Sequence, residues 1–582
     1  MKKILPIILI LSIVVLTTIG LVGCDFGPKK LDAPLVMIVG NTASWNADSN
    51  AVSYLLSING NLIKVPSTQT TRKLLEGQTL KVRAVGDNEN YLTSDWSNMV
   101  SYMLSSGSGN GSDNGSGNGS GSGSGNGGNT TPNPTPTPTP SGAVDLNFLM
   151  INDTHGAFTD SDSSVSIGRV DTLLNNLESE NGDYIFIQNG DAFQGSYVSG
   201  ETYGKAILDA LNIMELDAFV IGNHEFDWGL DKIALYADGN QANGEANFPF
   251  LGANIYYENT TTRPDWIKPY TIVEQDGLKV GIIGVIGYGQ ESSILTRYAK
   301  PYDFAEPLPI IREWAGYLRN TMNCDSVVVS THSYEEGLNV DIASLSGQYR
   351  IDAIFCGHTH YRITESVVRT DAQSIPVVQC RDKNQNAQEV VLRFDGTTKD
   401  YVSYYTSVKY PADYAISSRV QTVIDSYQEL IDLSKESLGY TSSYIDKGTL
   451  GSYATEALLD YTYPQNTFGS IDLAIINTGG VRATIDSGSI TRASVFEVFP
   501  FNNMVVIVNM RGSLLKSLCS NNSGFFYIAG DYTTLNDNTM YQLAVIDYVF
   551  EGTRYYQFEG CQYIETGVLM RDLLIEYIET IY

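Results

Sequence analysis

Ile221-Gly222-Asn223-His224-Glu225-Phe226-Asp227 is a polar cluster that begins where the apolar run of residues 218–221 stops. An apolar run of this length predicts a short buried strand. Asn223, His224 and Asp227 then offer an amide oxygen, an imidazole and a carboxylate within five positions. Because open α/β sheets build their sites just beyond strand ends, the stretch predicts a functional site in an α/β fold.

All five histidines of the chain follow this pattern, in which polar side chains come directly after an apolar run. They are His155, His224, His332, His358 and His360. Asp153 precedes the first of them, and Asp191 ends another run that has no histidine. Five predicted strands would therefore bring these groups to one end of a sheet. For any single histidine a satisfied core or surface position is the simpler explanation, but the shared pattern favours ligands.

The residue types in the cluster suit transition metals. Histidine and carboxylate together favour zinc, manganese, iron or nickel over calcium or magnesium. The candidate ligands are Asp153, His155, Asp191, Asn223, His332, His358 and His360. This set is larger than the four ligands of one tetrahedral site. Two divalent metal ions are the economical interpretation.

The order of these motifs resembles that of the calcineurin-like metallophosphoesterases, over residues 145–408. The resemblance rests on residues 153–155, 190–191, 222–225, 332 and 357–360. The longer forms at residues 152–156 and 222–227 resemble the branch that contains 5′-nucleotidases and UDP-sugar hydrolases. Helical patterns at residues 167–177 and 204–211 alternate with the strands, as expected for a central α/β metallophosphoesterase sandwich.

The resemblance implies a role for each candidate ligand. One metal would be held by Asp153, His155 and His360, and the other by Asn223, His332 and His358, with Asp191 bridging them. Such a pair makes a hydroxide at neutral pH and orients a phosphate for in-line attack. His224 would stay free of metal and act on the phosphoryl and leaving-group oxygens, while Asp227 would fix its tautomer.

A helical connector is predicted at residues 409–438, and residues 439–582 resemble the α+β C-terminal substrate-binding domain of 5′-nucleotidases. That resemblance implies four nucleotide contacts: Arg482 to phosphate, Phe501 and Tyr548 as stacking aromatics for the base, and Asn503 beside Phe501. The alternative is that Phe501 belongs to the core and Arg482 is a surface charge. Thr478, Thr553 and Arg554 depart from the family pattern, which leaves base and sugar preference open.

Residues 1–24 resemble the signal peptide of a bacterial lipoprotein. Lysines 2 and 3 precede an apolar stretch at residues 4–22, and residues 21–24 resemble a lipobox that would leave Cys24 to carry lipid. An uncleaved anchor is the alternative, because the stretch could just span a bilayer. Both place the rest of the chain outside the cytoplasm, attached to the cell membrane. The other five cysteines are scattered and odd in number, so they do not indicate a disulfide framework.

Short β-rich runs alternate with turns at residues 34–103, which is typical of a β-sandwich. Trp45, Tyr54 and residues 94–97 resemble a fibronectin type III-like module. We interpret it as a spacer, with glycan or cell-wall contact as the alternative. Residues 105–142 are rich first in Gly, Ser and Asn and then in Thr and Pro, the composition of a flexible and then stiffer linker.

The length of 582 residues indicates several domains, and the formal net charge is −29. This charge argues against nucleic-acid polymers as partners. It does not exclude a small phosphate ester, because two divalent ions would bring +4 against the two negative charges of Asp153 and Asp191.

These features predict a surface-anchored dinuclear phosphohydrolase of extracellular nucleotides, a 5′-nucleotidase with UDP-sugars or 2′,3′-cyclic nucleotides as further substrates. Two alternatives remain open. The modular layout also suits an adhesion or binding protein without turnover, although such a protein would be expected to have lost ligands. The departures after Tyr548 suit a metallohydrolase of other phosphate or sulfur esters.

Overall fold

The computed structural model describes residues 29–39, 41–58, 61–75, 77–86, 91–102, 142–161, 163–552 and 555–582. The predicted signal peptide with Cys24, residues 103–141 of the linker, and Thr553 and Arg554 lie outside the described residues. The chain divides into two compact units, Met1–Asn59 with Lys64–Ser108, and Gly60–Ile63 with Gly109–Tyr582.

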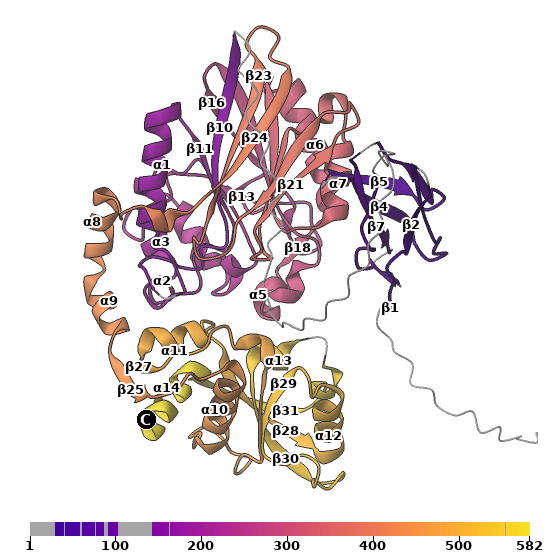
Figure 1. Ribbon diagram of the computed structural model, residues 1–582. Helices are drawn as coiled ribbons and strands as arrows, with labels where there is room; N and C mark the ends of the chain where they lie inside the picture. Colours follow the sequence, from indigo (N-terminus) through magenta and orange to yellow (C-terminus); the bar gives the residue numbers. More distant parts are fainter. Residues whose placement is uncertain are drawn as a thin grey trace, which may run out of the picture. The chain divides into compact units, whose positions relative to one another are not determined.

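The N-terminal unit is built from short strands (Figure 1). One sheet has the order β2-β3-β6, with β2 (Val36–Val39), β3 (Thr42–Trp45) and β6 (Thr71–Lys73) antiparallel. Four further strands are neighbours in the order β5-β4-β7-β9, namely β5 (Asn61–Pro66), β4 (Ser53–Ile58), β7 (Thr79–Val85) and β9 (Val100–Ser101). β1 (Lys29–Lys30) pairs with β8 (Tyr91–Leu92). Trp45 and Tyr54 are buried with ring centroids 5.8 Å apart, so both pack in the core. The fibronectin type III-like assignment stays a prediction.

The larger unit begins with a sheet of order β15-β13-β12-β11-β10-β23-β24. Its strands are β10 (Ala143–Ile151), β11 (Ile185–Asn189), β12 (Ala218–Val220), β13 (Phe250–Leu251), β15 (Ile267–Lys268), β23 (Ala387–Asp395) and β24 (Tyr401–Lys409). The strands from β10 to β15 are parallel neighbours, and β23 and β24 add antiparallel. Helices connect the parallel strands, namely α1 (Ile167–Asn181), α2 (Tyr197–Glu201), α3 (Lys205–Ile213) and α4 (Leu230–Ala234). Their positions agree with the helical patterns predicted at residues 167–177 and 204–211.

A second sheet packs on the first and has the order β16-β17-β19-β20-β22-β21 in this unit. Its strands are β16 (Tyr270–Gln275), β17 (Leu278–Ile286), β19 (Ser326–His332), β20 (Ala353–Cys356), β22 (Ser374–Gln379) and β21 (Ile363–Val368). Its helices are α5 (Thr296–Ala299), α6 (Pro307–Asn320) and α7 (Glu336–Ser344), and β14 (Ile255–Tyr257) pairs with β18 (Tyr302–Phe304). The two sheets approach closely, because a Cβ on Gly284 of β17 would lie 2.4 Å from Cβ of Leu251 on β13.

This arrangement corrects the expectation that the ligand-bearing strands share one sheet. β10, β11 and β12 belong to the first sheet, whereas β19 and β20 belong to the second. All five strands are almost fully buried apolar runs, and such runs do not indicate which of two sheets a strand joins.

The chain then passes through α8 (Ser418–Ser426) and α9 (Gln428–Ser434), within the predicted connector, into the C-terminal part, which has a mixed sheet and helices of its own. Its sheet has the order β29-β26-β30-β28-β31, with β29 (Phe526–Ala529), β26 (Leu473–Asn477), β30 (Met540–Ile546), β28 (Met504–Arg511) and β31 (Gln562–Leu569). The helices are α10 (Lys447–Asp460), α11 (Arg492–Val498), α12 (Gly512–Asn521), α13 (Asp547–Glu551) and α14 (Met570–Ile581). β25 (Ser437–Thr441) and β27 (Gly488–Thr491) form a separate antiparallel pair.

Within the described part of the chain, none of the helices has the length and hydrophobicity that a membrane span requires. The five cysteines of the described residues are free thiols, and Cys356 is fully buried in β20, as predicted for a packing residue.

Candidate functional site

The predicted ligands cluster in loops that follow the central strands of the two sheets. Five of them have a left-handed backbone: Asp153 (φ 49°), His155 (45°), Asp191 (54°), His358 (78°) and His360 (60°). Non-glycine residues rarely adopt this conformation, and where it occurs in clusters it marks functional sites. The backbone therefore supports the same positions that the sequence pattern selected.

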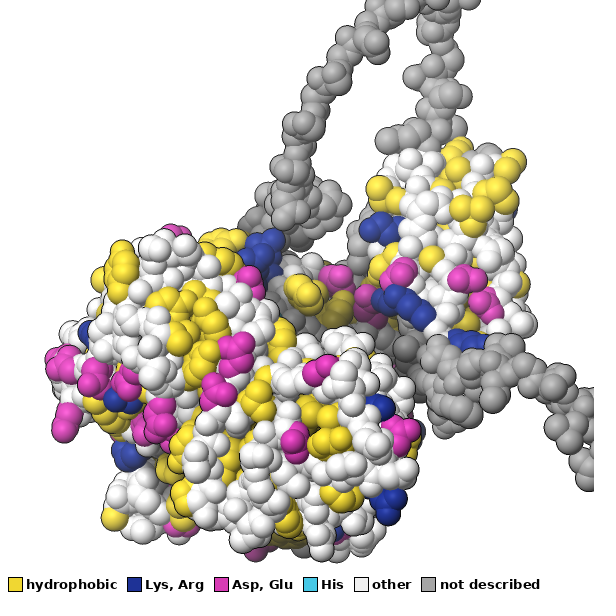
Figure 2. Space-filling model, turned by 90° about the horizontal axis from the view of Figure 1, so that it is seen from below, with side chains coloured by type: hydrophobic (Ala, Val, Ile, Leu, Met, Phe, Trp, Pro, Cys, Tyr) yellow, Lys and Arg dark blue, Asp and Glu magenta, His cyan; other side chains and the backbone are white. Residues whose placement is uncertain are grey.

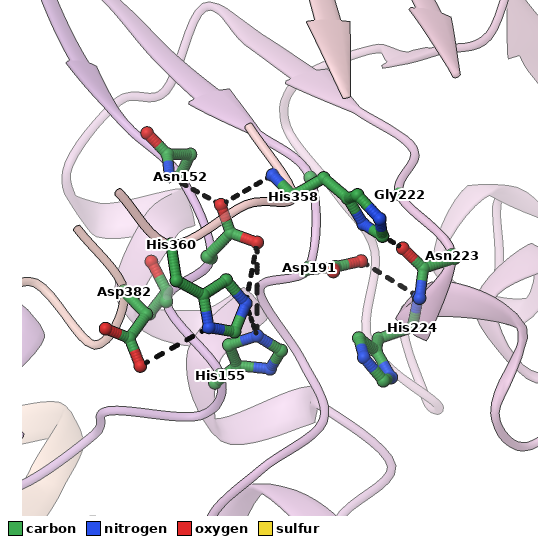
Figure 3. Close-up of polar contacts among 12 residues, drawn as sticks. Asn152, His155, Asp191, Gly222, Asn223, His224, His358, His360 and Asp382 are labelled. Carbon is green, nitrogen blue, oxygen red and sulfur yellow. Dashed lines mark hydrogen bonds and ion pairs between the residues drawn. The ribbon is translucent and has the colours of Figure 1, made fainter. Parts of the chain in front are cut away.

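The first group of side chains joins the β10 loop to the loop after β20 (Figure 3). Donor atoms of Asp153, His155 and His360 all lie within 4.8 Å of one another. Nε2 of His155 and Nε2 of His360 are 3.1 Å apart, and Nε2 of His360 is 3.3 Å from Oδ1 of Asp153. Nδ1 of His155 is 3.0 Å from the carbonyl oxygen of Gln194. An Nδ1–H donated to this carbonyl would leave the Nε2 lone pair for a metal.

The second group joins loops of both sheets. Donor atoms of Asp191, His332 and His358 lie within 4.8 Å of one another. Nε2 of His332 is 2.9 Å from Oδ2 of Asp191, and Nδ1 of His332 faces the carbonyl oxygen of Asn189 at 2.9 Å. Nδ1 of His358 is 2.9 Å from Oδ1 of Asn223. Asp191 lies in this group and also in a group with His155, so it is placed between the two sets.

Three buried polar atoms at this centre make no hydrogen bond of good geometry, although a donor or acceptor atom of another candidate ligand lies within 3.3 Å of each. They are Oδ1 of Asp153, Oδ2 of Asp191 and Nε2 of His332. Burial alone lowers the pKa of His332, but the carboxylates of Asp191 and Asp153 raise it to about 10. Uncompensated buried carboxylates of this kind need positive charge, and divalent cations would supply it. The donor set thus fits a pair of divalent metal ions.

His224 lies beside the cluster and is held by a carboxylate. Its Nδ1 is 2.7 Å from Oδ2 of Asp227, and its backbone N–H donates to Oδ1 of Asp191 at 2.8 Å. Burial lowers the pKa of His224, but Asp227 and Asp191 outweigh it and raise the pKa to about 9. The imidazole of His224 is also stacked on Phe501, with ring centroids 5.7 Å apart and planes inclined by 19°. His224 is therefore ordered from two sides.

A cavity of about 390 Å³ opens over these residues. Its lining includes Asp191, Asn223, His224, Asp227, His358 and His360 from the metallophosphoesterase-like part, and Asn477, Arg482, Phe501, Asn503 and Tyr548 from the C-terminal part. The predicted substrate residues thus meet the predicted metal residues at one cavity. Phe501 is half-buried and not a core residue, and the guanidinium carbon of Arg482 lies 5.8 Å from its ring centroid.

Two of these residues have further partners. The amide of Asn503 donates to Oδ1 of Asp547 at 3.1 Å, so it is already engaged within the C-terminal part. The hydroxyl of Tyr548 lies 3.4 Å from the carbonyl oxygen of Ser292 on the other side of the cavity. Both residues line the cavity, but their polar groups also hold its walls together.

Comparison with known families agrees with this geometry. The family model of calcineurin-like phosphoesterases matches residues 146–362, and that of the 5′-nucleotidase C-terminal domain matches residues 424–530. The chain therefore contains a domain similar to calcineurin-like phosphoesterases, followed by a domain similar to the C-terminal domain of 5′-nucleotidases. The 5′-nucleotidase precursor of Thermus thermophilus has the same fold, with a TM-score of 0.63, 20% identity, and coverage of 75% of this chain and 96% of that one.

Two curated relatives of this chain are longer proteins. The trifunctional nucleotide phosphoesterase protein YfkN of Bacillus subtilis is 26% identical over 443 residues, which cover 68% of this chain and 29% of YfkN. The cell wall protein Lmo0130 of Listeria monocytogenes is 27% identical over 468 residues, which cover 68% of this chain and 58% of that protein. The match thus spans less than two thirds of either relative.

Glu225 lies at the candidate site, and the sequence analysis missed it. Its carboxylate is fully buried and accepts three backbone N–H groups: Oε2 those of Gly222 at 2.8 Å and Asp191 at 2.9 Å, and Oε1 that of Ala192 at 2.9 Å. Glu225 therefore ties the Asp191 loop to the Asn223 loop. The sequence contained an indication of this role, because a glutamate that directly follows His224 in an apolar stretch must accept hydrogen bonds when it is buried.

The loop after β22 supplies a second set of missed residues. Oδ2 of Asp382 is 3.7 Å from Nδ1 of His360 (Figure 3), and the backbone N–H of Lys383 donates to the carbonyl oxygen of Asp153 at 2.7 Å. Asn384 is buried and accepts from the hydroxyl of Thr154 at 3.1 Å. This loop holds the first ligand group from outside, and no motif in the sequence marked it.

Contacts on both sides of the cavity join the phosphoesterase-like part to the C-terminal part. Arg297 forms an ion pair with Glu551 and lies 3.4 Å from a carboxylate oxygen of Asp547. On the other side, the hydroxyl of Ser163 donates to Oε2 of Glu497 at 3.0 Å, and the rings of Tyr197 and Phe496 have centroids 5.7 Å apart. The cavity is therefore enclosed by contacts that neither part could make alone.

Proposed function

We propose that the chain is a dinuclear metal-dependent phosphohydrolase that acts on extracellular nucleotides and is anchored to the membrane through lipid at Cys24. The observation that carries this proposal is the single cavity in which two groups of candidate ligands, the His224–Asp227 pair and the side chains of Arg482, Phe501 and Tyr548 meet. The name of the cell wall protein Lmo0130 supports an extracellular location.

Each candidate ligand has a role in this proposal. Asp153, His155 and His360 would hold one divalent ion and Asn223, His332 and His358 the other, while Asp191 lies between the two sets. Bound there, such ions supply a nucleophile by lowering the pKa of water and neutralise charge on the phosphate. The chain's own contribution is to fix the donors, since each of His155 and His332 is oriented by a carbonyl oxygen on its Nδ1 side.

His224 is the proton donor in this proposal. Although burial lowers the pKa of the imidazole, the carboxylate of Asp227 on Nδ1 raises it and so stabilises the protonated form. Nε2 is then the atom that donates to a phosphoryl or leaving-group oxygen. Arg482 contributes a second positive group, whose planar guanidinium suits a phosphate or diphosphate.

Base binding falls to the aromatic side chains of the C-terminal part. Phe501 lies against His224 in this structure, so a base that stacks on Phe501 would use the ring face turned away from the imidazole. Tyr548 lines the same cavity and offers a second ring. The proposal covers mononucleotides first, with UDP-sugars and 2′,3′-cyclic nucleotides as further substrates of the same centre.

A substrate panel tests the proposal. Protein lacking residues 1–24 is reconstituted with Mn²⁺ or Zn²⁺ and assayed for hydrolysis of AMP, 2′,3′-cyclic AMP and UDP-glucose, by phosphate release for the first and by chromatography of the products for the last two. Hydrolysis that is abolished by a chelator and restored by metal is expected. If none of these substrates is hydrolysed, or if hydrolysis is insensitive to the chelator, the proposal fails.

The alternative of a binding protein without turnover is disfavoured by the ligand set, because all seven candidate ligands are present and converge. The substitution His224→Ala separates the two. An enzyme loses turnover and keeps its metal, whereas a binding protein shows no change in ligand affinity. The other alternative is a metallohydrolase of non-nucleotide esters. It would be favoured if nucleosides did not inhibit the protein while small phosphate or sulfur esters were hydrolysed.

A further inference from the structure

The N-terminal unit presents aliphatic side chains to solvent on its edge strand β2. Leu35, Met37 and Val39 are 62%, 61% and 82% exposed, whereas Val36 between them is 2% exposed. Because side chains alternate along a strand, the three exposed residues share one face. An exposed sheet face normally carries polar side chains at these positions. Figure 2 shows hydrophobic side chains (yellow) exposed on this unit.

A fourth apolar side chain lies beside this strand. The amide of Asn98 bonds both backbone groups of Val36, accepting from its N–H at 3.0 Å and donating to its carbonyl oxygen at 2.8 Å. The next residue, Met99, is 58% exposed. We call Leu35, Met37, Val39 and Met99 the apolar edge. Contiguous exposed apolar side chains of this kind mark interaction surfaces.

The charge of the unit differs from that of the rest of the chain. Residues 29–102 carry seven Lys and Arg against six Asp and Glu, whereas residues 142–582 carry 27 against 57. Lys73 lies on the same outward face as the apolar edge, because it pairs with Thr42, which in turn pairs with Val39. The N-terminal unit is thus the part of the chain that an anionic surface does not repel.

We propose that the apolar edge rests in the interfacial layer of an anionic lipid bilayer, with Lys73 at the headgroups. The position of the unit in the chain supports this occupant. Lys29 follows Cys24 by five positions, a distance of at most about 18 Å in extended chain. This inference uses the lipid anchor proposed above to place the unit at the membrane, and it adds a second membrane contact beside that anchor.

Two other occupants fit the surface less well. A second copy that added a strand to β2 would need free backbone groups, but at Val36 these are already bonded to Asn98. A glycan would need flat aromatic platforms, but the apolar edge consists of Leu, Met and Val side chains. Aliphatic side chains flanked by lysine match a lipid surface.

The test uses the chain from residue 24 onward with Cys24→Ser, so that no lipid is attached. Vesicles of phosphatidylcholine with 30% phosphatidylglycerol are sedimented with this protein and with the double variant Met37→Ser/Val39→Ser. The control variant is Tyr444→Ser, which changes a side chain that is 58% exposed in the larger unit. Unfolding temperature and phosphate release are measured for each protein, because a loss of activity would concern the proposed function and not this surface.

We expect the parent chain and the control to bind the vesicles, and the double variant to bind at least about tenfold more weakly with an unchanged unfolding temperature. Should the double variant unfold early, Leu35→Ser alone replaces it in the comparison. Equal vesicle binding by parent and variant overturns the proposal. It is equally overturned if the substitutions instead abolish a dimer seen by analytical ultracentrifugation, or binding to purified peptidoglycan, while vesicle binding is unaffected.

Discussion

Replacing Glu225 by glutamine should weaken metal binding without removing any metal ligand. Oε2 of Glu225 accepts from the N–H groups of Asp191 and Gly222, and Oε1 accepts from that of Ala192. A glutamine oxygen can keep the first two bonds, but its NH₂ then faces the N–H of Ala192. The variant thus loses one hydrogen bond and places two N–H donors against each other, which costs about 2–3 kcal/mol at a buried site.

Part of that cost should appear as movement of the Asp191 loop. Partners that orient metal ligands typically contribute a factor of about 10–100 in metal affinity. We therefore expect Glu225→Gln to lower the affinity for Mn²⁺ or Zn²⁺ by at least about tenfold, measured by competition with a chelator of known affinity. The free energy of unfolding of the metal-free protein, from urea denaturation, should fall by about 1–3 kcal/mol.

The matched control is Glu389→Gln. Glu389 is also buried and accepts from the hydroxyl of Tyr184 at 2.6 Å, with Lys409 at 3.0 Å, but it lines a different cavity, together with Asp145 and Arg393. This variant should lose stability and keep its metal affinity. If Glu225→Gln binds metal as tightly as the parent protein, the positioning role assigned to Glu225 is wrong.

Three further substitutions test other parts of the structure. His224→Asn should lower kcat for AMP by about 10²–10⁴-fold while metal affinity stays within a factor of a few, as shown by kinetics and metal titration on the same preparation. Arg482→Lys should raise KM more than it lowers kcat, because lysine cannot form a bidentate contact with phosphate, and Arg511→Lys on the exposed end of β28 should change neither. Burial raises the pKa of Asp217 from 3.8 to about 6, although the N–H of Phe186 opposes the shift. Because the folded state binds the proton of Asp217 more tightly than the unfolded state, this group stabilises the fold fully below pH 4 and loses that contribution as the pH rises through 6. Asp217→Asn should remove this pH dependence. At pH 7 it should raise the free energy of unfolding by about 1–2 kcal/mol, after a discount for partial exposure. Urea denaturation at pH 4.5 and pH 7 would contradict this prediction if the free energy of unfolding changed by the same amount between the two pH values in both proteins.

The sequence was most informative where local pattern and chemistry coincide. The apolar runs before Asp153, Asp191, Asn223, His332 and His358 are strands, and each one is followed by the residue that reaches the cluster. A buried strand that ends in a polar group is recognisable because its residues are contiguous. Helix α1 was likewise predictable, since its apolar residues recur with helical spacing and Ser166 caps its first turn.

Features that depend on contacts between distant segments could not be predicted in this way. β19 pairs with β17 and β20, and no local pattern encodes whether it joins these strands or the sheet of β11. The stacking of Phe501 on His224 joins residues that are 277 positions apart. The loop of Asp382 and Lys383 has no composition that distinguishes it from an ordinary turn.

The left-handed backbone at five candidate ligands indicates what these positions were selected for. Each such non-glycine residue costs about 1–2 kcal/mol relative to an ordinary conformation. The carboxylates of Asp153 and Asp191 are moreover almost fully buried, which adds a desolvation cost. A fold under selection for stability alone would place glycine in the loops and apolar side chains in the centre. The conformation of these loops is therefore explained by the ligand atoms that it aims at one point, and the rest of the two sheets supplies the stability that offsets the strain.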